Sequence, residues 1–256
     1  MADDSILYSI SAHVGYITLN RPESGNRVNP IMAEALAGIC SQINGNQDIY
    51  LAVVTGSGDA FCTGGETERL KAAGLSKEAP AGISASEAIA SINRPTIAAI
   101  NGEAIGEGLE IALSCDLRIA SDNSRFGLPQ INDGCIPVHG GTQRLPRIVG
   151  RGKALELVLT GEIIDAQTAL EIGLVNKVVD RASLHSEVDA IAKNIAGKAP
   201  WALQYVKEAV NKGSDLTLEQ GLRLEADLYF LLHTTSDRTE GITSFLHKKT
   251  PEYKGG

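Results

Sequence analysis

The sequence TIAAINGEAIGEGLEIALSCDLRIAS, residues 96–121, contains three short apolar segments, and a glycine-rich turn separates the first from the second. TIAAIN and DLRIAS have the length and composition of buried strands, and LEIALS between them has the composition of a buried helix. Gly102, Gly106 and Gly108 lie within seven positions before that helix. A strand, a helix and a second strand in this order predict part of a mainly parallel, buried sheet.

The segments on the N-terminal side continue this pattern. ILYSISAHVGYITLN, residues 6–20, alternates apolar and polar residues on both sides of Ala12 and His13, which predicts a β-hairpin. NPIMAEALAGICSQI, residues 29–43, predicts a helix with Asn29 as its N-cap and Pro30 at the first helical position. YLAVVTG, residues 50–56, predicts a buried strand. The apolar stripe expected on the helix consists of Ile31, Ala35, Leu36, Ile39 and Ile43.

The pattern changes after about Leu145, where the chain becomes mostly helical. One further strand is predicted at LVNKVV, residues 174–179. The segment AGLSKEAPAGISAS, residues 73–86, is rich in glycine, proline, serine and alanine, and it is predicted to be a mobile loop. The helical segments are residues 153–161, 165–174, 183–197, 201–213 and 217–234.

Composition excludes several classes of function. The chain has 256 residues, 43% of them hydrophobic and 21% charged, as in ordinary soluble globular proteins. Its net charge of −8 argues against nucleic acid as a partner, because phosphate binding needs a basic surface. No apolar run approaches the roughly 20 residues of a membrane span, and the acidic start resembles neither a signal nor a transit peptide.

The cysteines and histidines indicate neither zinc nor a redox motif. The cysteines are widely spaced without a CxxC pair, and the histidines are scattered without an HxxxH pair, so no metal site is expected. Buried, reduced thiols in a cytoplasmic protein are the favoured interpretation. The four cysteines are Cys40, Cys62, Cys115 and Cys135.

The glycine-rich turns allow two interpretations. A dinucleotide-binding loop is disfavoured, because GEGLEI places Ile111 where the third glycine of GxGxxG belongs, and no GK[ST] follows. An oxyanion site is the other candidate, since GSGDAFCTGGETERL, residues 56–70, is a second such loop, and each loop offers amides near a helix start. The alternative is that both loops are simply tight turns in which glycine permits positive φ. Spacing alone supports this alternative and the oxyanion site equally well.

Longer motifs resemble one known family, the enoyl-CoA hydratases and isomerases, or crotonases. NRPESGN and EGITSFLHKK also fit that family, and the resemblance covers essentially the whole chain in one register. The motifs are specific for the family but not for one reaction within it. They are AFCTGG at residues 60–65, RPTIAAINGEAIGEGLEIALSCDLRIAS at 94–121, RFGLPQINDGCIPVHGGTQRLPRIVG at 125–150 and ALELVLTGEIIDAQTALEIGLVNKVV at 154–179.

The resemblance implies an α/β fold, a crotonase-like spiral of ββα units with a helical C-terminal trimerisation region. Residues 1–195 would form the spiral core with the CoA and acyl site. Residues 196–256 would form the helical region that builds a homotrimer or homohexamer and closes the CoA site. The implied partner is an acyl-CoA thioester substrate, with no nucleic acid or membrane. No cofactor is implied beyond coenzyme A as part of that substrate.

The resemblance also assigns site residues. Two backbone amides, of Gly65 and of Glu107 in the middle of GEG, would hold the thioester oxygen. Hydratases of the family use two glutamates to hold a water and to pass protons. Glu110 matches the first of them, whereas the second position, in FGxPE, is occupied here by Gln130.

Gln130 leaves three functions open. A glutamine can orient water through hydrogen bonds, but it cannot carry a proton near neutral pH, and losing one acid–base group lowers rates by about 10²–10⁴. The favoured interpretation is a hydratase that uses Glu110 alone as its acid–base group. The second is another acyl-CoA reaction, such as isomerisation, hydrolysis or C–C chemistry. The third is a non-catalytic CoA-ester binding protein.

Further residues are assigned to supporting roles. Asp133 and His139 are auxiliary candidates at the acyl pocket, although a turn residue and a helix cap are the favoured alternatives for them. The resemblance places the adenine of CoA near GNRV, residues 25–28, and near the start of GGETERL, with its phosphates on lysines such as Lys248 and Lys249. The residues predicted to bind CoA are Asn26, Val28, Gly64, Glu66 and Lys254.

Overall fold

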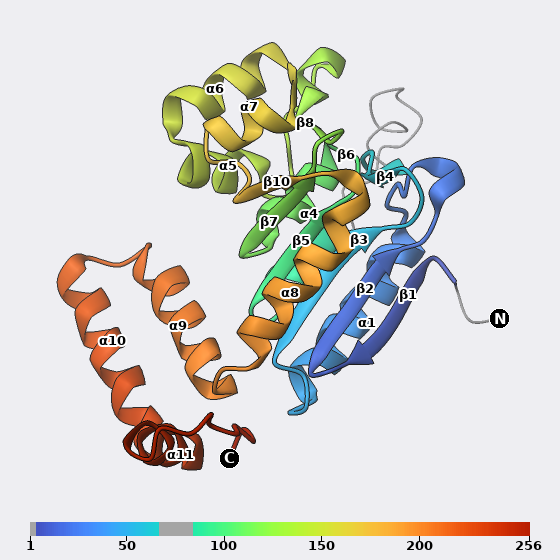
Figure 1. Ribbon diagram of the computed structural model, residues 1–256. Helices are drawn as coiled ribbons and strands as arrows, with labels where there is room; N and C mark the ends of the chain where they lie inside the picture. The colour runs from blue at the N-terminus through green and yellow to red at the C-terminus, as the bar shows by residue number, and fades with distance from the viewer. Residues whose placement is uncertain (1–3, 67–83) are drawn as a thin grey trace.

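A twisted six-stranded sheet lies at the centre of the computed structural model, which describes residues 4–66 and 84–256 (Figure 1). Its strand order is β1-β2-β3-β5-β7-β10. β1 and β2 are antiparallel, and every following pair is parallel, so the predicted hairpin and the predicted parallel sheet are confirmed. The strands are β1 (Ile6–Ser11), β2 (Val14–Leu19), β3 (Leu51–Gly56), β5 (Thr96–Ile100), β7 (Leu117–Ser121) and β10 (Lys177–Val179).

Helix α1 (Pro30–Gly45) begins where the sequence predicts. The Asn29 side chain accepts a hydrogen bond from the Met32 N–H, and Pro30 is the first helical residue. The predicted apolar stripe is wrong at Ile31, which is 61% exposed. Ile31 lies about 100° around the helix from the buried Met32, on the solvent side. The buried face consists of Met32, Leu36, Cys40 and Ile43.

A second, four-stranded sheet has the order β4-β6-β8-β9. Its strands have three residues each, too few to show an alternating pattern, and the sequence pattern therefore missed them. β4, β6 and β8 are parallel and follow β3, β5 and β7 along the chain, which confirms the implied spiral of ββα units. The strands are β4 (Ala60–Cys62), β6 (Glu103–Ile105), β8 (Arg125–Gly127) and β9 (Ile163–Asp165).

Glycine is required where the chain passes from one sheet to the other. A Cβ at Gly102 would lie 2.0 Å from the Asp59 carbonyl oxygen, and one at Gly56 would lie 2.2 Å from the Ala60 carbonyl oxygen. The Asn101 side chain fixes this crossing, because it accepts the Gly56 N–H at 3.2 Å. The close approach of two backbones therefore explains these two glycines.

Both faces of the large sheet are buried. Ala52 and Val54 of β3 face one apolar cluster, and Leu51 and Val53 face the other, as alternate residues of a strand must. α1 and α4 contribute to the first cluster, and α8 contributes to the second. Most of the predicted loop at residues 73–86 lies outside the described residues, and its last three residues form the N-cap and first turn of α3. These helices are α3 (Ala85–Ala90), α4 (Glu107–Ser114) and α8 (Leu184–Ala196).

The last three helices project from the amino end of the parallel strands (Figure 1). Lys207 of α9 contacts Asp116 at 2.8 Å and donates a hydrogen bond to the Arg94 carbonyl, next to the starts of β7 and β5. No helix of the described residues is both long and apolar enough to cross a membrane. The remaining helices are α5 (Gly141–Val149), α6 (Arg151–Thr160), α7 (Ala166–Glu171), α9 (Pro200–Gly213), α10 (Leu218–Leu232) and α11 (Ser236–Leu246), with short 3-10 helices η1 (Pro22–Ser24), η2 (Pro129–Asp133) and η3 (Arg181–Ser183).

Candidate active site

Three neighbouring strands of the second sheet end at one edge, and each leads into a predicted site segment. β4 leads to Gly65, β6 leads to α4 with Glu107 and Glu110, and β8 leads to η2 with Gln130. Parallel strands have their carboxyl ends at the same edge, where α/β proteins place their ligands. The sheet thus brings together residues that are up to 65 positions apart in the sequence, from Gly65 to Gln130.

Gly65 forms a parallel β-bridge with Val28. The Val28 N–H donates to the Gly64 carbonyl at 2.9 Å, and the Glu66 N–H donates to the Val28 carbonyl at 2.8 Å. Gly65 lies between these two bonded residues in the parallel bridge, so its own N–H points to the other side. The strand next to β4, which ends three residues before Gly65, is β6.

Glu107 is the first residue of α4. Its N-cap, Gly106, has φ of +57° and ψ of −126°, a conformation that glycine can adopt. The glutamate side chain at position 107 is therefore compatible with the turn, because the positive φ falls on its glycine neighbour. N–H groups in the first turn of a helix point outward and favour negative charge.

Gly108 packs the start of α4 directly against β4. A Cβ at Gly108 would lie 1.9 Å from the Cys62 carbonyl oxygen. The turn that holds Glu107 therefore lies against the strand that leads to Gly65. Gly64 and Gly106 have positive φ, as tight turns require, whereas Gly108 permits the close approach.

The Glu110 carboxylate is held by backbone amides. Glu110 is fully buried, and its Oε1 accepts hydrogen bonds from the His139 and Gly141 N–H groups, each at 2.8 Å. Hydrogen bonds to an ionised carboxylate are short and strong, and they favour the charged form. Two amides on one oxygen fix the orientation of the carboxyl group relative to the edge of the sheet.

Gln130 is buried beside the same edge. Neither its Oε1 nor its Nε2 has a hydrogen-bond partner within the described residues. Leu128, two residues earlier, lies against Gly141, since a Cβ there would be 2.9 Å from Leu128 Cδ1 and 3.1 Å from Glu110 Oε1. Buried side-chain amides without partners are rare in proteins, and they point to a bound ligand or water.

Comparison with known proteins identifies the family. The sequence profile described as Enoyl-CoA hydratase/isomerase matches residues 9–256. The chain belongs to this family. An (E)-benzylidenesuccinyl-CoA hydratase from Thauera aromatica is 39% identical, with 98% of this chain and 99% of that protein covered. A crotonyl-CoA hydratase from Syntrophomonas wolfei is 36% identical over 99% of both chains.

Solved structures of the enoyl-CoA hydratase/isomerase family share the fold. The crystal structure of an enoyl-CoA hydratase from Bacillus anthracis has a TM-score of 0.92 and 37% identity, and it covers 98% of this chain and 100% of that one. A similar agreement is found with the enoyl-CoA hydratase of Mycobacterium tuberculosis, at a TM-score of 0.91 and 29% identity.

Of the two auxiliary candidates, His139 lies closer to the site than Asp133. The backbone N–H of His139 binds Glu110, and its imidazole is half-buried. Asp133 is exposed at the end of η2, before Gly134, which has φ of +70°. His139 therefore meets Glu110 through its main chain, and Asp133 has the position of a turn residue.

The residues predicted to bind CoA near Gly65 form one hydrogen-bonded unit. Asn26 is fully buried, and its side-chain amide accepts the Arg21 N–H and donates to the Ser57 and Ala60 carbonyls. Glu66 forms an ion pair with Arg21 at 2.7 Å. The Asn26 side chain is thus used to hold the loop that pairs, through Val28, with the Gly64–Glu66 turn.

Lys254 lies at the other end of the molecule. It follows α11, its backbone N–H binds the Asp237 carboxylate at 2.8 Å, and its side chain is exposed. Within one chain, this tail is attached to the helices at the amino ends of the strands (Figure 1), whereas Gly65 follows the carboxyl end of β4. A single chain does not bring Lys254 to Gly65 and Glu110.

Two residues that the sequence did not indicate reach the site. Arg144 donates to the His139 carbonyl at 2.9 Å, and Ser86 donates to the same oxygen at 2.7 Å. Burial lowers the pKa of Arg144, while the nearby Glu110 and Glu87 carboxylates act to raise it. Arg144 follows the Gly140–Gly141 pair closely in the sequence, and this position could have marked it as a candidate. Its target could not have been predicted, because that target is a backbone carbonyl.

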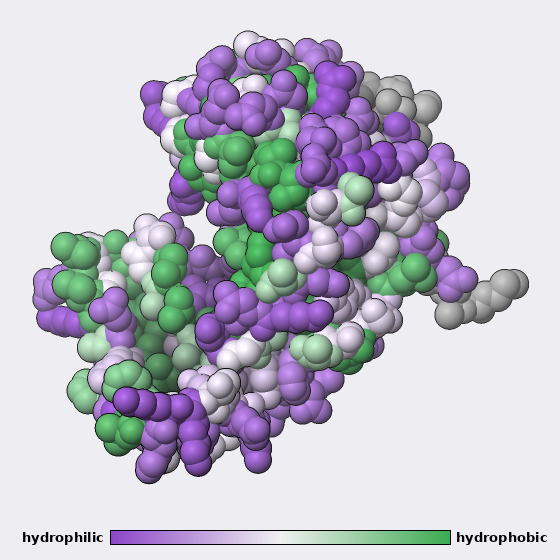
Figure 2. Space-filling model, in the orientation of Figure 1, coloured by the Kyte–Doolittle hydropathy of each residue, from purple (hydrophilic) through white to green (hydrophobic). Residues whose placement is uncertain are grey.

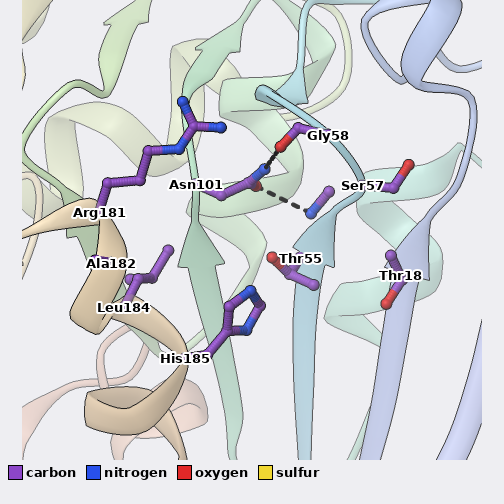
Figure 3. Close-up of a pocket in the computed structure, with 10 residues that line it drawn as sticks. Thr18, Thr55, Ser57, Gly58, Asn101, Arg181, Ala182, Leu184 and His185 are labelled. Carbon is purple, nitrogen blue, oxygen red and sulfur yellow. Dashed lines mark hydrogen bonds between the residues drawn. The ribbon is translucent and has the colours of Figure 1, made fainter.

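A separate recess of about 740 Å³ lies at the carboxyl ends of β2, β3 and β5, beside the start of α8 (Figure 3). Within the described part of the chain, none of the predicted site residues lines it. Its Asn101 side chain binds the Gly56 N–H and the Gly58 carbonyl, and Arg181 forms an ion pair with Asp59. These polar groups stabilise the crossing between the sheets. Its polar lining includes Thr18, Thr55, Ser57, Asn101, Arg181 and His185.

Proposed function

We propose that this protein adds water across the double bond of an enoyl-CoA or dienoyl-CoA thioester and catalyses the reverse dehydration. The observation that carries the proposal is a buried carboxylate, Glu110, and a buried amide, Gln130, on segments that follow the neighbouring strands β6 and β8. The names of relatives support hydration, since proteins 39%, 36% and 34% identical are described as hydratases.

The two turns would stabilise charge on the thioester. The carbonyl oxygen next to sulfur accepts the Gly65 and Glu107 N–H groups, and it becomes an enolate oxygen when water attacks Cβ. Preorganised amides of this kind stabilise the developing charge more than the neutral ground state, and each is worth about 10²–10³ in rate. The Gly64–Glu66 turn and residues 25–28 would lie beside this oxygen and would contact the CoA moiety.

Glu110 would carry the proton. Its ionised carboxylate takes a proton from water as the water oxygen bonds to Cβ, and then gives that proton to Cα of the enolate. One group can serve both steps because the proton that it accepts is the proton that it returns. Gln130 would hold the water or the thioester, since its amide both donates and accepts hydrogen bonds.

The proposed reaction needs no cofactor. Addition of water transfers no electrons and no group other than the water itself, and coenzyme A enters as part of the substrate. We place the enzyme in the cytoplasm, where thiols stay reduced, because Cys40, Cys62, Cys115 and Cys135 are all free.

We also propose that the chain works as a homotrimer or homohexamer. Apolar side chains are exposed on the projecting helices, including Leu218 at 80% and Phe245 at 83% (Figure 2). Another exposed group lies near the site, including Ile136 at 63% and Leu159 at 65%. Two different apolar surfaces favour a head-to-tail contact that closes into a ring, in which one copy's tail, with Lys254, reaches its neighbour's site.

Sedimentation velocity tests the assembly. The expected mass is three or six times 27.0 kDa at micromolar concentration. Replacing the exposed Phe245 with aspartate is expected to lower the mass by charging the apolar surface. A parent protein that sediments as a 27.0 kDa monomer at every concentration contradicts the proposal.

A hydration assay tests the function. The purified protein is given crotonyl-CoA, and the expected result is a product heavier by one water, with loss of the absorbance of the conjugated thioester. Enoyl-, dienoyl- and ketoacyl-CoA thioesters follow as a panel read by mass spectrometry. An isomer of unchanged mass, a free acid, or no product from any of them contradicts hydration and supports, respectively, isomerisation, hydrolysis or binding alone.

The same assay includes a Gln130→Glu variant. A carboxyl at position 130 adds a second proton carrier, and the rate of crotonyl-CoA hydration is expected to rise at least about tenfold. Gln42→Glu, at an exposed position on α1, adds the same charge away from the site and is expected to change nothing. A brisk parent enzyme that gains nothing from Gln130→Glu shows that the missing glutamate does not limit the rate.

A further inference from the structure

We infer that Arg144 and Ser86 are positioning residues for Glu110, which they control by fixing the backbone between His139 and Gly141. The inference rests on the proposed function of Glu110. Neither residue is expected to touch the substrate; each binds the His139 carbonyl.

The contacts form a short chain from three elements. Glu110 of α4 accepts N–H groups from His139 and Gly141, which lie on both sides of the peptide bond that joins His139 to Gly140. The carbonyl of that peptide bond receives Ser86 Oγ of α3 at 2.7 Å and Arg144 Nη1 of α5 at 2.9 Å. Of three successive peptide groups, the central one accepts the two side-chain donors through its carbonyl. The outer two donate their N–H groups to the Glu110 carboxylate.

This backbone needs external support. A peptide plane is rigid, so its orientation is set by the φ and ψ angles on either side of it. Here those angles belong in part to Gly140, which has φ of +107°, and Gly141 follows directly. Glycine pairs are flexible, and without donors on the His139 carbonyl the plane could turn and move both N–H groups away from Glu110.

The Arg144 guanidinium packs closely against the loop that it holds. A Cβ at Gly140 would lie 2.0 Å from Arg144 Nη1, so the guanidinium fills the space that a larger residue would need. The carboxylates that face it are Glu110 from α4 and Glu87 from α3. Its positive charge also favours the ionised form of Glu110, which the reaction requires at its start.

Ser86 supports the loop from the opposite element. It is fully buried in the first turn of α3, and its hydroxyl lies 3.1 Å from that of Ser84, the N-cap residue. A buried hydroxyl that donates to a carbonyl in another element ties α3 to the loop before α5.

The kinetic test compares two arginines of one helix. Arg144→Met is expected to lower kcat for hydration by about 10²-fold, because small displacements of a catalytic group have effects of that size. KM is expected to stay within about threefold, since the substrate contacts remain. Arg147→Met is the matched control, because Arg147 lies on the same helix with an exposed side chain and a surface ion pair to Asp215.

Rescue and pH dependence separate positioning from loss of structure. Arg144→Lys keeps a donor and a charge, and it is expected to recover about tenfold of the lost kcat. Ser86→Ala is expected to lower kcat about tenfold. Removing the cation in Arg144→Met disfavours the Glu110 carboxylate, with Glu87 as the remaining charge on that side, so the acidic limb of kcat/KM is expected to move to higher pH.

Amide hydrogen exchange provides a readout that needs no activity. The N–H groups of His139 and Gly141 are expected to exchange at least about tenfold faster in Arg144→Met than in the parent, and unchanged in Arg147→Met. If the parent turns over no thioester, the proposed function fails, and this measurement still decides the inference. Unchanged exchange together with unchanged kcat in Arg144→Met overturns it, and if that variant does not fold, the same outcome in Ser86→Ala overturns it.

Discussion

Replacing Glu110 with glutamine is expected to lower kcat for enoyl-CoA hydration by about 10²–10⁴, with KM nearly unchanged. The amide has the shape of the carboxyl group, and its oxygen can still accept the N–H groups of His139 and Gly141. It cannot take a proton from water. With Gln130 on the neighbouring segment, no second carboxyl replaces it there, and Asp133 is exposed at the far end of η2.

The measurement is the steady-state rate with crotonyl-CoA, together with the melting temperature. Glu103→Gln is the matched control, because Glu103 lies exposed on β6, a few residues before Glu110. The control is expected to keep the parent rate. If Glu110→Gln hydrates the true substrate as fast as the parent does, Glu110 is not the acid–base group.

Replacing Gly108 with alanine is expected to lower kcat by about 10²–10³, as the loss of one oxyanion donor does. The new Cβ would lie 1.9 Å from the Cys62 carbonyl oxygen and 2.7 Å from its carbonyl carbon, which are backbone atoms and cannot turn aside. The start of α4 must therefore move away from β4, and the Glu107 N–H moves with it. Overpacking of this kind also destabilises the fold by about 1–3 kcal/mol.

Chemical unfolding and hydration kinetics of the Gly108→Ala variant check this expectation together. Gly152→Ala on α6 is the matched control, because a Cβ at Gly152 meets nothing within 4 Å and alanine favours a helix. The control is expected to be at least as stable as the parent and equally active. A Gly108→Ala variant with parental stability and rate is the result that contradicts the assigned contact between the two turns.

The elements that build the large sheet could be predicted because each carries a local signal. The hairpin has its alternation and a two-residue turn, and α1 has the Asn29–Pro30 start. The second sheet carries no such signal, because three residues are too few for a period. β9 illustrates this, since it lies at residues 163–165 between helical segments where the sequence predicted no strand.

The candidate site residues follow from the resemblance to a family and not from their spacing. Gly65, Glu107 and Gln130 are separated along the chain, and they follow β4, β6 and β8, which pair in the sheet that the pattern missed. The glycines were ambiguous for a physical reason, since glycine suits both a tight turn with positive φ and a turn that offers its amides to an oxyanion. Arg144 escaped notice because it binds a main-chain oxygen, which every residue carries.

The division of the site between main chain and side chains has an evolutionary consequence. In the proposed site, the turns after β4 and β6 contribute the main-chain N–H groups of Gly65 and Glu107, and every residue except proline carries such a group. Positions 110 and 130 contribute side chains, which a single nucleotide change can replace. With such a site, a lineage can keep the main-chain hydrogen bonds to the thioester while it exchanges the groups that move protons. New reactions can therefore arise on this scaffold through very few mutations.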